Sequence, residues 1–426
     1  MQTSRLRALN KFSILIGLGL ASLLVPAARA AAREKVLYSF SGVSDGAVPS
    51  SNLVLDASGH LYGTASSGGD TKDCSDGCGV VFELTSTNGK WREAVLYAFR
   101  GGTDGVGPSG NLVLDAAGNL YGTTFRGGSA NCTGGCGMVF ELAPKSDGSW
   151  KETVLYRFQD GGDGALPVGL SIDASGKLYG ATITGGTEFG TVFELSPPVG
   201  DNDDAWKETT LYSFQAFEIQ ANPGLVFDAK GDLYGSWYQL YQCSPPDSCG
   251  TAFQLKFTDH RWEETNLYDF SGGGNGGQPM AGVVLDSKGN LYGTGEDGGN
   301  NWGIAFELKR SGTSWTEVML HNFCSLNNCA DGSQPEAPLV FDKAGNLYGT
   351  TVGGGTGCAY PGCGVVFELS PSKNGWTERV LHSFKNEPND GASPVEGLIL
   401  DGNGNLFGTT PAGGVDGRGT VFEVTP

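Results

Sequence analysis

One short motif, Leu followed by an aromatic residue and Gly, recurs seven times and limits the folds that are open to this chain. Its aromatic residues are Tyr62, Tyr121, Tyr179, Tyr234, Tyr292, Tyr348 and Phe407. Successive copies are 55 to 59 residues apart. So regular a period indicates a repeat architecture, in which each unit is one supersecondary structure that packs against its neighbours.

Each repeat has the pattern of four short strands. In the first repeat, the apolar run at 53–56 suits a strand that is buried on both faces. The Leu-aromatic-Gly motif forms the second strand, V-F-E-L at 81–84 the third, and 91–99 the fourth. The first two strands are joined by a D-x-x-G turn, as at 115–118, where Asp and Gly supply turn chemistry. Four antiparallel strands repeated around an axis predict a β-propeller.

The two ends of the chain complement each other. The last repeat ends at its third strand, 421–424, whereas the sequence 36–40 is a fourth strand without a repeat of its own. We therefore expect the N-terminal strand to complete the last blade. This pairing closes the ring and removes the exposed sheet edges that an open array would keep. The prediction is an all-β, seven-bladed propeller spanning residues 31–426.

The repeat resembles a known family. The pattern G-N-L-Y-G-T-T, followed by G-G, G-x-V-F-E-L, L-Y-S-F, D-G and P, is similar to the GloVer tandem repeats of secreted bacterial proteins. The D-x-x-G-x-L-Y-G-T core is also similar to regulator-type propeller repeats, in which Trp usually stands in place of Tyr. The resemblance covers essentially the whole mature chain. It implies the architecture and assigns no chemistry.

Residues 1–30 have the features of a secretory signal peptide. A basic segment with Arg5 and Lys11 precedes an apolar run at 12–25, which is short for a membrane span. An A-x-A sequence at 28–30 predicts cleavage after Ala30. We therefore expect an exported protein that is extracellular, periplasmic or at the cell surface, and that has no membrane insertion after the signal is removed.

The mature chain is strongly acidic. The signal carries four of the 27 basic residues and none of the 46 acidic ones, which leaves a net charge near −23. Such a surface repels phosphate backbones and anionic lipid. Nucleic acid and membrane surfaces are therefore excluded as expected partners, and we expect a monomer.

Ten cysteines fall into five close pairs: Cys74/Cys78, Cys132/Cys136, Cys243/Cys249, Cys324/Cys329 and Cys358/Cys363. In an exported protein this pattern predicts local disulfides. Zinc would need four ligands in one place, but each pair lies in a different repeat and has no His beside it. Pairing between neighbouring loops, such as Cys324 with Cys358, stays open.

The histidines do not converge in this topology. His60 and His260 fall in turns on one face, and His321 and His382 occupy outer-rim strands. A His-based nucleophile or a zinc site needs such residues to meet. We therefore expect no metal site, no cofactor and no catalytic residue of this kind.

The repeated acidic residues are interpreted as scaffold. A D-G-x-x-P motif recurs at Asp45, Asp104, Asp163, Asp331 and Asp390, with Asn275 at a sixth site. A ring of carboxylates suits calcium, but Asp-Gly also makes a common turn, and recurrence in most blades favours the turn. The glutamates of V-F-E-L and W-x-E are interpreted as solvated strand positions; they are Glu83, Glu141, Glu194, Glu307, Glu368 and Glu423, and Glu93, Glu152, Glu208, Glu264, Glu317 and Glu378.

A candidate ligand site is predicted where the repeat breaks. Loops between the second and third strands vary most, and variable loops on a rigid scaffold often carry function. The fourth repeat lacks both the D-G and the Gly-Gly of the others. Exposed aromatics beside polar groups suit sugars and peptides. The predicted ligand-binding residues are Trp237, Tyr238, Tyr241, Trp302, Asp297 and Asn301, on the loop-rich face where blades 4 and 5 meet.

Three functions stay open. The leading hypothesis is a non-catalytic binding module for a glycan or a protein partner. The alternative is a glycan-active hydrolase or lyase, which needs two carboxylates about 5–10 Å apart in the central mouth. The non-repeated acids placed for that role are Glu188, Glu218, Glu296 and Asp297. The third hypothesis is a structural spacer, and the fold cannot decide among the three.

Overall fold

The computed structural model of the protein describes residues 31–187, 189–200, 205–215, 219–221, 224–239, 249–259 and 261–426. The expected signal peptide and its cleavage after Ala30 lie outside these residues. Within them, Ala32–Pro426 form one compact unit.

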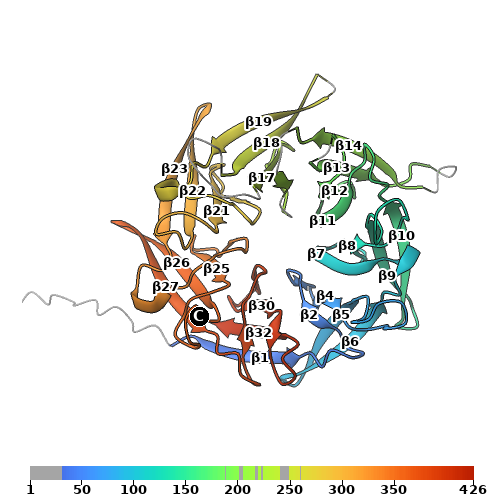
Figure 1. Ribbon diagram of the computed structural model, residues 1–426, viewed down its shortest axis with the longest axis horizontal. Helices are drawn as coiled ribbons and strands as arrows, with labels where there is room; N and C mark the ends of the chain where they lie inside the picture. Colours follow the sequence, from blue (N-terminus) through green and yellow to red (C-terminus); the bar gives the residue numbers. More distant parts are fainter. Residues whose placement is uncertain are drawn as a thin grey trace, which may run out of the picture. The chain divides into compact units, whose positions relative to one another are not determined.

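Seven antiparallel sheets are arranged as blades around a central axis, as the repeat predicts (Figure 1). From the axis outward, blade 1 consists of β2 (Ala47–Pro49) with β3 (Val54–Leu55), β4 (Leu61–Ser67), β5 (Val80–Thr87) and β6 (Lys90–Ala98). Blade 2 consists of β7 (Val106–Leu114), β8 (Leu120–Arg126), β9 (Met138–Pro144) and β10 (Trp150–Arg157). Blade 3 consists of β11 (Ala165–Ile172), β12 (Leu178–Thr184), β13 (Thr191–Ser196) and β14 (Lys207–Ser213).

The remaining blades follow the same order. Blade 4 consists of β15 (Ile219–Ala221) with β16 (Val226–Phe227), β17 (Leu233–Gln239), β18 (Thr251–Thr258) and β19 (Arg261–Asp269). Blade 5 consists of β20 (Val284–Leu285), β21 (Leu291–Gly295), β22 (Ile304–Ser311) and β23 (Ser314–Asn322). Blade 6 consists of β24 (Val340–Phe341), β25 (Leu347–Thr351), β26 (Val365–Ser372) and β27 (Gly375–Ser383). Short 3-10 turns, η1 (Gly102–Asp104), η2 (Gly273–Asn275) and η3 (Asn327–Cys329), lie in connections between blades.

Blade 7 joins the two ends of the described chain, as predicted. It consists of β29 (Ile399–Leu400), β30 (Leu406–Thr410), β32 (Thr420–Thr425) and the N-terminal β1 (Arg33–Ser39). β1 pairs antiparallel with β32, from Arg33 opposite Thr425 to Ser39 opposite Thr420. β28 (Gly391–Ala392) and β31 (Ala412–Gly413) form a short ladder of their own. The ring is therefore closed by a backbone ladder between residues almost 400 positions apart in the sequence.

The Leu-Tyr-Gly motif is explained by what surrounds it. A Cβ on Gly63 would lie 2.6 Å from Cζ of Phe82 on the next strand, so the ring of V-F-E-L fits only against Gly. The Tyr62 hydroxyl donates to the carboxylate of Asp56 in the D-x-x-G turn, at 3.3 Å. The same carboxylate accepts the backbone N–H groups of Ser58 and His60, both at 2.8 Å. Turn, second strand and third strand are thus specified together.

Neighbouring blades are joined by phenylalanine pairs. The Phe after the outermost strand of one blade packs edge-on against the V-F-E-L Phe of the next, with ring centroids 4.9 to 5.8 Å apart. The pairs are Phe40/Phe82, Phe99/Phe140, Phe158/Phe193, Phe214/Phe253, Phe270/Phe306, Phe323/Phe367 and Phe384/Phe422. The hydrophobic core is accordingly divided into seven clusters, and each combines residues of two adjacent blades.

The cysteine prediction is confirmed for four local pairs. Disulfides join Cys74 to Cys78, Cys132 to Cys136, Cys324 to Cys329, and Cys358 to Cys363. The alternative pairing of Cys324 with Cys358 is therefore wrong, because each closes a bridge within its own loop.

The fifth predicted pair, Cys243 with Cys249, is described only at Cys249. Cys249 is fully buried in the hydrophobic cluster between blades 4 and 5, and its backbone N–H donates to the carbonyl of Phe270 at 2.7 Å. It therefore has a packing role at this blade junction, which spacing alone does not indicate. Cys243 lies outside the described residues, so a Cys243–Cys249 bridge stays a prediction.

Among the described residues, no helix has the length and the apolar character that a membrane span requires.

The interpretation of the glutamates as solvated is wrong for several of them. In V-F-E-L, Glu307 and Glu368 are buried, because the tyrosine of the neighbouring strand covers them. The Glu307 carboxylate accepts the Tyr292 hydroxyl at 3.0 Å. In W-x-E, an oxygen of Glu93 and one of Glu152 are fully buried without a hydrogen-bond partner. Glu93 and Glu152 lie beside Asp45 and Asp104, in the connections from the preceding blades, which a strand pattern within one blade does not reveal.

The aspartates of D-G-x-x-P have the turn role that was predicted for them. Asp45 accepts the backbone N–H of Ser41 at 2.8 Å and the hydroxyl of Tyr38 at 2.8 Å. Asp104 accepts the hydroxyl of Tyr97 at 2.6 Å in the same way. Each carboxylate therefore ties a loop to the outermost strand of the preceding blade.

Deletion of residues 31–42 removes β1 and leaves β32 as an unpaired edge. We expect the deletion variant to lose cooperative unfolding or to aggregate, because an open ring exposes backbone donors and acceptors. Calorimetry and light scattering on the purified variant measure both effects. A deletion variant that keeps the melting temperature of the parent would contradict the closure mechanism.

The outer-strand glutamates predict a pH dependence of stability. Burial raises the pKa of Glu93, Glu152 and Glu208 from 4.5 to about 7. The folded protein therefore holds protons that the unfolded chain has released between these values, and the free energy of unfolding falls as pH rises through this window. Urea unfolding in the presence of a chelator should give higher stability near pH 5 than near pH 8.

A double Glu93→Gln, Glu152→Gln variant is the control for this pH dependence. It should flatten the decline, because the amides do not titrate. If the parent is as stable near pH 8 as near pH 5, or more stable, these carboxyls do not govern the pH dependence of its stability.

Candidate functional site

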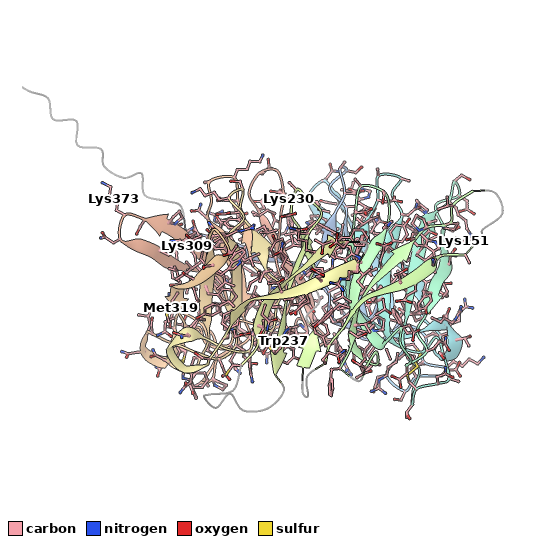
Figure 2. The ribbon with its side chains drawn as sticks, turned by 90° about the horizontal axis from the view of Figure 1, so that it is seen from above. Lys151, Lys230, Trp237, Lys309, Met319 and Lys373 are labelled. Atoms are coloured by element: carbon pink, nitrogen blue, oxygen red, sulfur yellow. A yellow bond between two sulfur atoms is a disulfide. The ribbon has the colours of Figure 1, made fainter. Side chains whose placement is uncertain are left out.

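The propeller has two unlike faces. We call the side with the turns between first and second strands and between third and fourth strands the turn face, and the opposite side the loop face. Figure 2 shows Lys230 and Lys373, which lie in two such turns, on one side, and Trp237 toward the other. The ligand site predicted from the sequence lies on the loop face. Cavities are found on both faces and in the central channel.

On the loop face, Trp237 and Tyr238 point in different directions. They are neighbours on β17, so their side chains leave opposite sides of the blade. Trp237 is half-buried against the hydrophobic cluster between blades 3 and 4. Burial, followed by the charges of Glu296 and Glu336, raises the pKa of Tyr238, which places this phenol toward the channel acids.

Trp302 packs toward blade 6. Its ring makes an edge-to-face contact with the exposed Tyr360, with centroids 6.0 Å apart. The contacts of Trp237 and Trp302 therefore lead away from each other around the ring, to blade 3 and to blade 6. Tyr241 lies outside the described residues. Ligand binding by this patch stays a prediction.

The two polar residues of the predicted site have local structural roles. The backbone of Asp297 bridges to Gly277, and burial raises the pKa of its carboxyl. Asn301 is exposed, and its backbone is in the left-handed region with a φ of 67°. Its N–H donates to the carbonyl of Gly298 at 2.9 Å. Asn301 is thus a turn residue, which asparagine tolerates better than most side chains.

Two glutamates in the central channel were not among the residues predicted from the sequence. A cavity of about 230 Å³ is lined by Asn52, Gly110, Asn111, Met280, Ala281, Glu336, Pro338, Val395 and Glu396. Burial, with repulsion from Glu296, raises the pKa of Glu336 to about 7. Burial, with repulsion from Glu336, raises that of Glu396 to about 7 as well. None of the residues lining this cavity is a cation that could neutralise the pair.

This finding corrects the predicted set of non-repeated acids. That set was Glu188, Glu218, Glu296 and Asp297, of which the first two lie outside the described residues. Glu336 and Glu396 lie three or four residues before the innermost strands β24 and β29, where an acid is easily taken for a turn residue. A signal was present: each lies in a P-x-x-x-L segment, and in no other repeat is that segment acidic.

A larger cleft opens on the turn face between blades 3 and 4. At four other junctions, the Trp of W-x-E packs on the aromatic residue of the preceding blade's Leu-aromatic-Gly motif, at 6.1 to 6.3 Å. In blade 4 the equivalent Trp262 instead packs on Phe257 of its own blade, at 5.5 Å. The cavity that lies between Trp262 and Tyr179 has a volume of about 620 Å³.

Phe257 gives Trp262 an aromatic partner within its own blade, while Trp262 also contacts the hydrophobic cluster between blades 3 and 4. The two residues are directly opposite each other on β18 and β19. At the same register position, blade 1 has Ser86 opposite Trp91, and blade 6 has Pro371 opposite Trp376. An aromatic side chain at this position supplies a partner within the blade. Phe257 is also 55% exposed, which is unusual for so large an apolar side chain.

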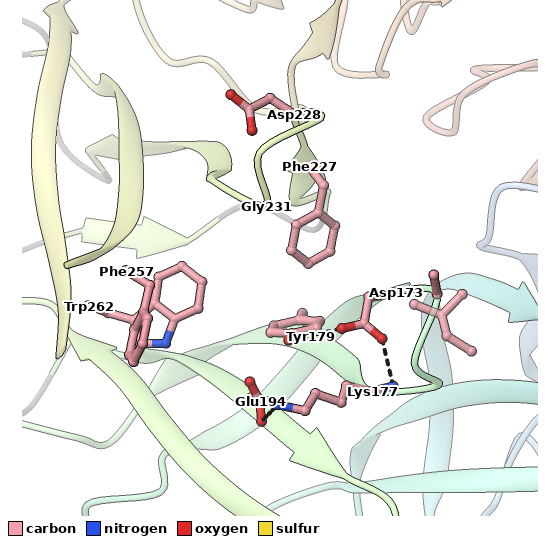
Figure 3. Close-up of a pocket in the computed structure, with 11 residues that line it drawn as sticks. Asp173, Lys177, Tyr179, Glu194, Phe227, Asp228, Gly231, Phe257 and Trp262 are labelled. Carbon is pink, nitrogen blue, oxygen red and sulfur yellow. Dashed lines mark hydrogen bonds and ion pairs between the residues drawn. The ribbon is translucent and has the colours of Figure 1, made fainter. Parts of the chain in front are cut away.

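The cleft combines aromatic walls with polar groups (Figure 3). Tyr179 packs edge-on against Phe227 of blade 4, with centroids 4.9 Å apart. The ammonium of Lys177 forms an ion pair with Glu194 at 2.8 Å. The carboxylate of Asp173 accepts the Tyr179 hydroxyl at 3.2 Å.

The hydrogen-bonded carboxyls of Asp173 and Glu194 in the cleft stay ionised near neutral pH. Burial acts to raise the pKa of Asp173, but hydrogen bonds from Ser175 and Lys177 outweigh it and hold the pKa below its usual range. Burial likewise acts to raise the pKa of Glu194, and the hydrogen bonds from Lys177 and Ser196 more than offset it. The cleft therefore offers anionic hydrogen-bond acceptors beside apolar rings.

The sequence carries one signal for this cleft. Phe257 is the only aromatic residue four positions after the Phe of V-F-E-L in any repeat. The signal is weak by itself, because the turn face is otherwise uniform and a single Phe in a strand is usually a packing residue.

Comparisons with known proteins agree with the repeat architecture. The model of the Gloeobacter/Verrucomicrobia repeat matches residues 24–243 and 224–426. No curated protein has a sequence that matches the chain. Among solved structures, a polysaccharide lyase PL25 ulvan lyase is 10% identical, with a TM-score of 0.54, and covers 91% of this chain and 95% of its own. The structure of this lyase bound to -[GlcA(1-4)Rha3S]- and a second structure of the lyase give the same values.

Another solved structure is a protein of unknown function from Dyadobacter fermentans. It is 13% identical, with a TM-score of 0.43, over 82% of this chain and 97% of its own. At such identities the likeness concerns the fold alone, so these structures transfer no site and no reaction.

Proposed function

The chain belongs to the Gloeobacter/Verrucomicrobia repeat family, and from this premise we propose that it is an exported, non-catalytic module that binds a glycan. The leader-like residues 1–30 and the four disulfides support export. The observation that carries the binding role is the cleft between blades 3 and 4. There the regular packing of the repeat gives way to an open aromatic cavity.

The size and lining of the cleft suit a sugar. Ligand sites of small molecules typically have volumes of about 300–1,000 Å³, and the cleft measures about 620 Å³. Phe257 and Trp262 offer ring surfaces against which the C–H face of a sugar can pack. Asp173 and Glu194 offer acceptors for sugar hydroxyls, and Lys177 offers a donor. Few polar groups around an apolar wall are typical of an orienting site.

Charge narrows the class of glycan. The cleft holds three carboxylates, those of Asp173, Glu194 and Asp228, and only one lysine. The whole chain carries a net charge of −19. Anionic polysaccharides would be repelled by both. We therefore assign the cleft to a neutral glycan. The ulvan lyase that shares the fold is named for a polysaccharide, which supports a glycan as the ligand. It supports neither the neutral charge of that glycan nor a reaction, since the -[GlcA(1-4)Rha3S]- bound to the lyase contains a uronic acid.

Replacement of Trp262 by Ala tests the proposal. A central aromatic anchor typically contributes about 2 kcal/mol or more to binding, so the variant should bind its glycan at least about tenfold more weakly. The ligand is first sought on an array of neutral polysaccharides, and the affinity of the best one is then measured by calorimetry. Failure of the parent to bind any neutral glycan, or equal affinity of the variant, would refute the assignment.

Two matched variants separate binding from stability. Trp376→Ala removes the equivalent Trp in blade 6, where it packs on Tyr292, so it should cost stability without affecting affinity. Phe257→Ser installs the residue that blade 1 has at this position. It should let Trp262 return to Tyr179 and close the cleft, with a loss of binding and no loss of melting temperature.

One observation favours a second function, glycan hydrolysis in the central channel. Glu336 and Glu396 lie in one cavity and have pKa values raised to about 7, as a general acid requires. Elimination chemistry on an acidic polymer fits less well, since the cavity lining has no cation to neutralise a uronate.

Glu336→Gln and Glu396→Gln distinguish the two functions. If the channel hydrolyses glycans, each variant should lower kcat by about 100-fold or more, because general acid–base groups contribute that much. Release of reducing ends from neutral oligosaccharides is the measurement, and Trp262→Ala is the control that leaves the channel intact. If the parent binds a glycan in the cleft but does not hydrolyse it, the hydrolase hypothesis is rejected and the binding module is retained.

A further inference from the structure

The ring-closing seam contains a cluster of three side chains that suits a metal ion. Glu34 on β1, His382 on β27 and Asp390 in the connection from blade 6 to blade 7 each offer one ligand atom, and these atoms lie within 4.8 Å of one another. It is the one such group of His, Cys, Asp or Glu found across the described ranges. His382 lies on an outer-rim strand, as expected from the sequence, but there it meets two carboxylates, which the sequence analysis did not consider.

His382 and Asp390 are hydrogen-bonded at a spacing close to that of two ligands of one metal ion. The Nε2 atom of His382 lies 3.0 Å from Oδ1 and 3.2 Å from Oδ2 of Asp390. Two ligands of a tetrahedral zinc ion, each about 2.0–2.2 Å from the metal, are separated by about 3.3 Å. Asp390 is held in place by the backbone N–H of Gly391, at 2.8 Å, so its carboxylate is already oriented.

Glu34 contributes the third ligand atom, a carboxylate oxygen. Its Oε1 atom is fully buried and has no hydrogen-bond partner in the described part of the chain. A buried carboxylate oxygen without a partner is costly, and a cation would compensate it. Lys385 also lies close enough to act on Glu34, but only as a weaker influence than burial and His382.

The other blade junctions show why this one is distinct. The outer-strand Glu recurs beside a Tyr at the position of His382, as with Glu93 beside Tyr38 and Asp45. Burial raises the pKa of Tyr38 above its usual range, so this hydroxyl keeps its proton and is a poor metal ligand. Two junctions therefore remain, those in which a His replaces the Tyr.

At the second histidine junction the aspartate is bound by other donors, although Nε2 of His321 and an oxygen of Glu378 are buried there without a hydrogen-bond partner in the described part of the chain. Asp331, the counterpart of Asp390, accepts the backbone N–H and hydroxyl of Ser325 at 2.9 and 2.7 Å, and the N–H of Leu326 at 3.1 Å. Its carboxylate is thus occupied by donors, whereas the bonds described for Asp390 come from His382 and Gly391. Within the described ranges, only the seam between blades 6 and 7 retains a convergent set of ligands.

From this geometry we propose that Glu34, His382 and Asp390 form a binding site for a divalent transition-metal ion, with zinc as the best fit, at the seam where the N-terminal strand closes the propeller. One imidazole and two carboxylates are ligands that zinc accepts, and a water molecule completes the four positions. The ion would connect β1 to blade 6, and so would fasten the strand that closes the ring.

Zinc titration by calorimetry, on mature protein first treated with a chelator, tests the site. We expect one zinc ion per chain. His382→Tyr installs the residue found at this position in most blades, so it should fold while its zinc affinity falls by about 100-fold or more, since even the groups behind metal ligands are typically worth about 10- to 100-fold. Glu34→Gln should also lower the affinity for zinc.

His321→Tyr is the matched control, and a structural readout accompanies it. This variant should bind zinc as the parent does, because the described residues at its junction do not form a convergent group of ligand atoms as Glu34, His382 and Asp390 do. Zinc should also raise the melting temperature of the parent and slow amide hydrogen exchange in β1, with neither effect in His382→Tyr. The proposal is overturned if the parent binds no zinc, if His382→Tyr binds it as tightly, or if His321→Tyr loses it.

Discussion

Edge-on packing of phenylalanines between blades is the interaction on which the rest of this structure depends. Each blade buries the ring of the next, and the seventh pair joins blade 7 to blade 1 through Phe40 and Phe82. A buried Phe to Ala change typically costs about 3–5 kcal/mol, so seven such contacts make the ring act as one unit. The glycine of each Leu-aromatic-Gly motif makes room for these phenylalanine rings, because a Cβ at Gly63 would collide with the Phe82 ring.

This rigid ring also determines where function can arise. The phenylalanine pairs recur at each of the seven junctions. A change in the other contacts of one junction can therefore open a local cavity while the ring stays closed. Trp262 packs on Phe257 beside a cleft that Tyr179 also lines, while the blade 6 counterpart Trp376 packs on Tyr292. At the ring-closing seam, His382 replaces a tyrosine and meets two carboxylates.

The fold was predictable to the level of individual strands, whereas the site was not. Seven copies of one motif, with a missing strand at one end and a spare strand at the other, specify the closed propeller and the pairing of β1 with β32. Four local disulfides followed from spacing alone, but spacing did not reveal that Cys249 is buried in the core. Trp237 and Trp302 pack toward different blades. Sequence order says which loop carries a side chain, but not the direction in which it leaves the strand.

What the sequence determined by itself is periodic: the number of blades, the strand order and the turn chemistry. Each of these depends on neighbours within one repeat, so the local pattern suffices. Only the tertiary structure decided which residues of different blades meet. Glu336 and Glu396 share one channel although they are far apart in the sequence, and Glu34 reaches His382 across almost the whole chain. The physical reason is ring closure, which brings side chains from separate repeats together in space without leaving a local sequence signal.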